Sequence, residues 1–150
     1  MAVAWHKVRA KLAASLPGII GPGTTFGVSI FDGPVVTGEN PPAAFTIAYA
    51  PSLAEPTVGR FTQEQGPDGY TATETGALVC ELAMATGYTT VPDVFGAFDA
   101  IASWIQADQT LGGTLSPAST CTAAADVVQA QSSSGAVQRL IVTISYRTNL

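Results

Sequence analysis

The side chains that could carry chemistry are few and lie far apart in this sequence. His6 is the only histidine, and Cys80 and Cys121 are the only cysteines. A Ser-His-Asp triad would have to use His6, and no Gly-x-Ser-x-Gly segment is present to expose a nucleophilic serine. A metal site needs Cys, His or carboxylate ligands at short spacing, and neither cysteine has a CxxC partner. We therefore expect no catalytic residues, no metal site, and two free thiols that pack as small hydrophobic side chains.

The glycines and the acids could carry two further kinds of chemistry, a glycine loop that binds phosphate and a carboxylate pair that hydrolyses glycosides. The glycines between residues 18 and 27 fit neither a GxGxxG loop nor a P-loop, and we interpret them as turns. Paired carboxylates for glycoside hydrolysis stay open, because any two of the 11 acids could converge in the fold. These acids are spread over predicted strands, loops and a helix. We therefore interpret the protein as a non-enzyme and expect no cofactor.

The charge distribution is uneven. Residues 61–138 contain no Lys or Arg and eight acids, and the whole chain has a net charge of −5. Only 11% of the residues are charged, against about 25% in ordinary domains. Such a chain is either a small globule with a neutral surface or a subunit whose outer face is buried by neighbouring copies. Its acidic surface would repel polyanions over roughly 10 Å, so DNA would slide beside it without binding.

Hydrophobic periodicity predicts one domain over residues 1–150, with two helices and six strands. A first helix over residues 3–16 has Trp5, Val8, Leu12 and Leu16 on one face and ends at Pro17-Gly18. Strands are expected at residues 26–31, 45–49, 58–63 and 70–86, with a reversing loop at residues 65–69. In the fourth strand the even positions Leu78, Cys80, Leu82 and Met84 form an apolar row, whereas most of the odd positions are small.

The second half of the chain predicts a capped helix and a hairpin. Residues 90–93, Thr-Val-Pro-Asp, have the chemistry of a capping box, and Phe95, Phe98, Ala102 and Ile105 would form the buried stripe. Strands at residues 121–131 and 136–146 would pair, with the row Leu140, Val142, Ile144 and Tyr146 facing inward. The fold class is therefore α+β, a mainly antiparallel sheet with both helices on one face, in the order α-β-β-β-β-α-β-β. No run reaches the ~18 apolar residues of a membrane span, and we expect synthesis in the cytoplasm without a signal peptide.

Three local strings carry a family resemblance. Residues 31–39 read Phe-Asp-Gly-Pro-Val-Val-Thr-Gly-Glu after a first strand, residues 76–82 read Gly-Ala-Leu-Val-Cys-Glu-Leu, and residues 139–146 read Arg-Leu-Ile-Val-Thr-Ile-Ser-Tyr. With the predicted element order, they resemble the tail terminator (tail completion) proteins of long-tailed bacteriophages, especially those of actinobacterial hosts. The likeness extends over nearly the whole chain.

The resemblance implies a structural virion protein, assembled in the host cytoplasm, that forms a hexameric ring on the head-proximal end of the tail tube. Its partners would be its own copies, the tail tube protein and the head-tail connector, with DNA passing through the ring without sequence-specific binding. Glu64 and Asp68 would belong to a loop facing the DNA channel or a ring face, and Asp32 and Glu39 to a partner-docking loop. The cations Lys7, Arg9 and Lys11 would contact acids of an adjacent subunit.

The sequence leaves other assignments open at this point. Another neck component, such as a connector or head-closure protein, or a minor tail protein would have the same size and topology. A monomeric binding module that displays the proline-bearing loop over residues 34–42 is a third class. The basic face with Lys7, Arg9 and Lys11 is more typical of an ordinary solvated helix, and both acidic loops are more typical of ordinary connections.

Overall fold

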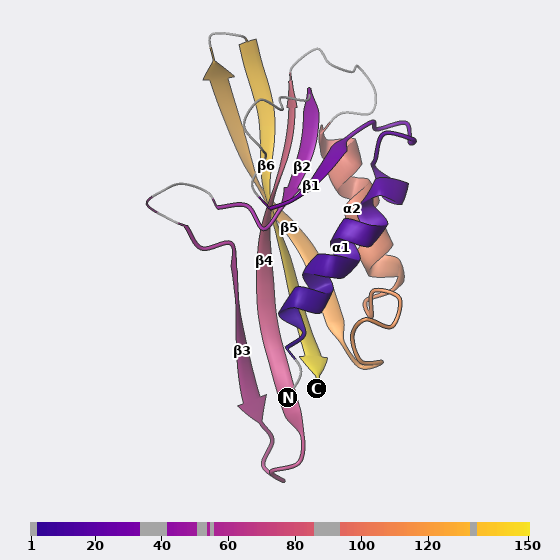
Figure 1. Cartoon of the computed structure of the whole chain (residues 1–150), viewed down its shortest axis with the longest axis vertical. Coiled ribbons are helices and arrows are strands. Elements are labelled where there is room, and N and C mark those ends of the chain that lie inside the picture. The colour runs from indigo at the N-terminus through magenta and orange to yellow at the C-terminus, as the bar shows by residue number, and fades with distance from the viewer. Residues whose placement is uncertain (1–2, 34–41, 51–53, 55, 86–93, 133–134) are drawn as a thin grey trace.

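The computed structural model describes residues 3–33, 42–50, 54, 56–85, 94–132 and 135–150. It has two helices and six strands, and the α+β class and the element order are confirmed (Figure 1). The elements are α1 (Trp5–Ile19), β1 (Ser29–Asp32), β2 (Ala43–Ile47), β3 (Gly59–Gln65), β4 (Ala72–Ala85), α2 (Val94–Ala107), β5 (Thr120–Ser132) and β6 (Gly135–Asn149).

One sheet organises the chain around β4. The strand order is β1-β2-β4-β6-β5, and β3 also pairs with β4. Because β3 uses residues 72–78 of β4 and β2 uses residues 80–84, both lie along the same edge of that strand. Every pairing is antiparallel except that of β1 with β2, which is parallel. The predicted reversing loop at residues 65–69 is confirmed as the turn of the β3–β4 hairpin.

Both helices cover one face of this sheet, and the core lies beneath them (Figure 1). Alternation in β4 and β6 sends one row of side chains into that core, as the apolar rows predict. The buried rows are Leu78, Cys80, Leu82 and Met84 in β4 and Leu140, Val142, Ile144 and Tyr146 in β6. From α1 the core receives Val8, Leu12 and Leu16, three of the four side chains expected there, whereas Trp5 is only partly buried.

The first helix is longer than predicted, because Pro17 lies inside it and does not end it. A proline inside a helix removes one backbone hydrogen bond and crowds the carbonyl four residues back, but continuing the helix past Pro17 buries Ile20 completely. Ile20 N–H donates to the Leu16 carbonyl at 2.9 Å, and Gly21 N–H donates to the Pro17 carbonyl at 3.1 Å. A Cβ atom at Gly21 would lie 2.2 Å from that carbonyl oxygen, so the turn requires glycine.

The buried face of α2 is also different from the predicted one. The buried residues are Val94, Ala97, Ile101 and Ile105, and Phe95 is 46% exposed. Apolar residues occupy more than one face of this helix, so periodicity allows two overlapping stripes, and only packing against the sheet selects one. The predicted capping box at residues 90–93 lies outside the described residues.

Candidate functional site

The turn of the β3–β4 hairpin extends beyond the helices (Figure 1), and β3 forms the outer, exposed strand of this hairpin, whereas β4 pairs with β6 on its other side. All residues of β3 after Gly59 are exposed, whichever face of the strand they occupy. Phe61 is 44% exposed, and Tyr70, just beyond the turn, is 95% exposed. Because exposure of large apolar side chains on an edge strand favours association, this hairpin is a candidate contact surface.

The two acids predicted to face a channel or a ring face both belong to this hairpin. Asp68 shapes the turn, because its carboxylate accepts hydrogen bonds from Tyr70 N–H at 2.9 Å and from Thr71 N–H and the Thr71 hydroxyl at 3.0 Å. The hydrogen bonds from Thr71 N–H and then Tyr70 N–H lower the pKa of Asp68, so its negative charge is held at the tip. Glu64 is exposed on β3. Their place on a lumen or ring face stays a prediction.

A buried carboxylate, Glu74, ties the part of the hairpin near its turn to the rest of the fold. It is fully buried and accepts three hydrogen bonds, from Ala4 N–H at 3.1 Å, the Gln63 side-chain amide at 2.8 Å and the Tyr146 hydroxyl at 2.5 Å. Burial, and then the hydrogen bond and charge of Glu74, raise the pKa of Tyr146. Sequence reasoning missed this cluster. Glu74 occupies an even-numbered position, like the apolar row of β4, and this spacing could have predicted that it is buried.

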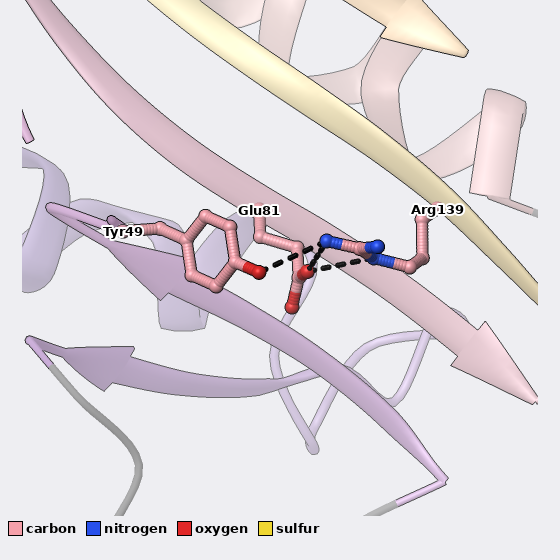
Figure 2. A network of polar contacts seen from close by, with 3 residues as sticks. All are labelled: Tyr49, Glu81 and Arg139. Carbon is pink, nitrogen blue, oxygen red and sulfur yellow. Dashed lines mark hydrogen bonds and ion pairs between the residues drawn. The ribbon is translucent and has the colours of Figure 1, made fainter. Parts of the chain in front are cut away.

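A second polar cluster lies on the sheet face opposite the helices (Figure 2). Arg139 of β6 forms an ion pair with Glu81 of β4, donating from Nε at 2.8 Å, and its terminal nitrogen donates to the Tyr49 hydroxyl at 2.9 Å. The side chains of Arg139 and Glu81 are 24% and 16% exposed. Beside the cluster is an open cavity of about 420 Å³, whose lining includes Tyr49, Glu81 and Val58.

Of the three basic residues of α1, one is exposed to solvent and two lie beside other segments of the same chain. Lys7 is exposed, and Arg9 forms an ion pair with Asp32 at 2.6 Å. In the loop that follows α2, hydrogen bonds from Thr110 and Gly112 lower the pKa of Asp108, and the charge of Lys11, which lies beside this loop, contributes less. Arg9 and Asp32 were predicted for two different partners, and the structure joins them to each other. Glu39 lies outside the described residues.

The two thiols are free and buried, as expected. Burial raises the pKa of Cys80 to about 12 and that of Cys121 to about 11, so neither is a thiolate at neutral pH. Within the described residues, no group of three or more His, Cys, Asp or Glu side chains could hold a metal ion. No helix in that part of the chain is long and apolar enough to cross a membrane.

Comparison with known proteins adds no family. No protein-family model matches the chain, and no curated protein sequence matches it. The resemblance to tail terminators therefore rests on the sequence strings and the element order. The described surface has an exposed edge strand, β3, and exposed large apolar side chains at Phe61, Tyr70, Phe95 and Val127.

Proposed function

We propose that this protein is a structural subunit of a bacteriophage virion, which assembles with its own copies into a ring, hexameric by resemblance. The ring caps the head-proximal end of the tail tube, stops tube polymerisation and joins the tail to the head connector, and DNA passes through its centre. The protein acts by contact alone, without a catalytic step.

The observation that carries this proposal is the exposed outer strand β3 of the β3–β4 hairpin, at one end of an elongated sheet (Figure 1). All of β3 after Gly59 is exposed, its outer edge is uncovered within the described residues, and Phe61 on it is half exposed beside the charged Arg60 and Glu64. A subunit buries that surface only on assembly. The low charge content of the chain has the same explanation, since charged residues are depleted where interfaces bury surface.

The acidic surface supports the passage of DNA. Asp68 keeps its charge through its turn hydrogen bonds, and Glu64 adds a second carboxylate on the same hairpin. Carboxylates on a surface repel the phosphates of nearby DNA and shorten the time that the DNA stays bound there. Screening by salt limits this repulsion to roughly 10 Å. These two acids are the proposed residues of the channel or of the ring face.

A connector or minor tail protein is the nearest alternative within the virion. A monomeric binding module is the alternative from another class, and the open cavity beside Tyr49 and Glu81 favours it, because cavities of this volume accept small ligands. A protein that remains monomeric with tail tubes present, and that binds a small molecule in this cavity, would support the module.

The decisive experiment adds the purified protein to growing tail tubes and measures tube length by electron microscopy. A terminator stops growth and appears as a collar at one end of each tube. Uncapped tubes, or an unchanged tube length after deletion of the gene, would end the proposal.

A second experiment tests the channel residues by DNA ejection and infectivity. Glu64→Lys together with Asp68→Asn should slow ejection, because the asparagine keeps the turn acceptor while the acidic charge is lost. Asp99→Lys, on the exposed side of α2, reverses an acidic charge away from the hairpin and is the control that should leave ejection unchanged.

A further inference from the structure

The outer edge of β3 carries unpaired backbone groups. Val79 N–H donates to the Val58 carbonyl at 2.8 Å, and Gly66 N–H donates to the Thr71 carbonyl at 2.7 Å. In the antiparallel register of β3 with β4, even-numbered residues therefore bond to β4, and odd-numbered residues, from Gly59 to Gln65, direct their N–H and C=O groups outward. Among the described residues, none pairs with these groups.

The outer edge of β5 has the same alternation. Ala85 N–H donates to the Pro42 carbonyl at 2.8 Å, so odd-numbered residues of β4 face β2 and even-numbered ones face β6. The even-numbered residues of β4 lie opposite even-numbered residues of β6, so the odd-numbered residues of β6 bond to the even-numbered residues of β5. The backbone groups of residues 121, 123, 125 and 127 in β5 are therefore directed outward. The Gln109 side chain accepts the hydrogen bond of Cys121 N–H, so within the described residues the free part of this edge runs over residues 122–127.

We propose that β3 of one copy pairs with β5 of the next copy, antiparallel, with Arg60 directly opposite Asp126. Strand direction allows this continuation: β3 and β6 run opposite to β4, and β5 runs with it. A neighbour that keeps its helices on the same side of the sheet therefore presents β5 antiparallel to β3. The inference rests on the self-assembly in the proposed function and names its contact surface.

The register follows from hydrogen-bond phase and charge. The outward-facing odd residues of β3 must lie opposite the outward-facing odd residues of β5. The possible registers therefore differ from one another by two residues. Only the register with residue 60 opposite residue 126 places two opposite charges face to face, and both side chains are exposed on the sheet face without helices. The same register sets Phe61 opposite Ala125 and diagonal to Val127, which is 65% exposed, so both apolar side chains are covered.

This register also gives the stagger that a closed ring of strands needs. Across one copy, Arg60 lies level with Ala77, Ser145 and Thr122. Thr122 then faces Glu64 of the next copy, so the chain of pairs advances by 64 − 60 = 4 residues over the four strands β3, β4, β6 and β5. One residue of shear per strand is the ratio of the (β/α)₈ barrel, where strands tilt by about 36°. Contacts between different surfaces of each copy form a ring when the rotation between copies closes, and an open filament when it does not.

Disulfide cross-linking tests the register. In a non-hydrogen-bonded antiparallel pair the Cα atoms lie about 4.5 Å apart, within the range of a disulfide. Arg60→Cys/Asp126→Cys should therefore give a ladder of linked chains under oxidation, both in concentrated solution and in assembled tails. Arg60→Cys/Thr122→Cys is the matched control, because the two positions would lie four residues out of register and should give no ladder. A ladder from the control, or none from the first variant in either sample, overturns the proposal.

Charge reversal gives an independent test by mixing. Arg60→Glu alone and Asp126→Arg alone should each weaken association by about tenfold per contact, because each places like charges opposite one another. Mixed in equal amounts, the two variants should assemble again, since alternating copies restore an opposite pair at every contact. Asp99→Lys should assemble normally throughout. Failure of the mixture to exceed either variant alone would refute the Arg60–Asp126 contact.

The two proposals fail differently. If wild-type protein caps tail tubes but the 60–126 ladder is absent, the ring stands and the strand pairing is wrong. If the ladder forms and the tubes stay uncapped, the strand pairing stands and the terminator function is wrong.

Discussion

Removing one hydroxyl, by Tyr146→Phe, tests whether the buried Glu74 cluster holds the hairpin to the body. The Tyr146 hydroxyl donates to Glu74 at 2.5 Å, and both residues are buried. A hydrogen bond to a charged group contributes about 1.5–3 kcal/mol. Glu74 keeps its bonds from Ala4 N–H and Gln63, so it is not left unpaired, and we expect a loss of about 2 kcal/mol in the free energy of unfolding. For a chain of this length, that lowers Tm by about 4–8 °C.

The assay is urea denaturation followed by circular dichroism, with Tyr70→Phe as the control. Tyr70 is 95% exposed, so its variant should match the wild type. The pH dependence has a definite sign. Because the folded pKa of Tyr146 is raised above the unfolded value near 10, its contribution is complete below pH 10 and declines as the pH rises further. The gap between wild type and Tyr146→Phe should therefore narrow above about pH 10. Equal stability of the two proteins at pH 7 would refute the role given to this bond.

Three further outcomes are expected from the same denaturation assay. Gly76→Ala should cost about 2–3 kcal/mol, because the added methyl group would lie 2.4 Å from the Tyr146 hydroxyl oxygen, whereas Gly18→Ala, which meets no atom within 4 Å, should not destabilise. Arg139→Met should cost about 1–2 kcal/mol by leaving Glu81 without its partner, and a second change, Glu81→Met, should recover most of that loss. A double variant no better than Arg139→Met would contradict this. Between about pH 9 and 12, the free energy of unfolding should fall less for Cys80→Val than for the wild type. Burial raises the pKa of the Cys80 thiol to about 12, so the wild-type protein loses the contribution of this thiol as the unfolded chain ionises. Parallel pH curves would show that Cys80 is not responsible.

Much of the fold could be predicted because its signals are local. The apolar rows of β4 and β6 recur every second residue, so strand type and inward face follow from the pleat alone. The turn at residues 65–69 follows from its Gly, Pro and Asp content. The first helix and its inward face followed from apolar spacing in the same way, although its end did not.

Other features could not be predicted, because they depend on contacts between distant segments. Tyr49 and Arg139 are 90 residues apart in the chain and meet only through the sheet. β1 pairs with β2 in parallel. The alternation of apolar and polar residues is the same in parallel and antiparallel strands, so it does not predict this direction. The buried face of α2 was misassigned, because several faces are apolar and the sheet selects among them. Arg9 and Asp32 were assigned to outside partners because sequence spacing does not show that they meet.

The sequence by itself determined the class of this protein: two helices, six strands, an acidic and weakly charged chain, and the rows that form its core. These follow from the short-range geometry of helices and strands, which repeats within a few residues. The tertiary structure alone decided which polar groups are buried together, which strands form the outer edges of the sheet, and which charges remain exposed. Those outcomes depend on strand order and register, which bring together residues that the sequence keeps far apart.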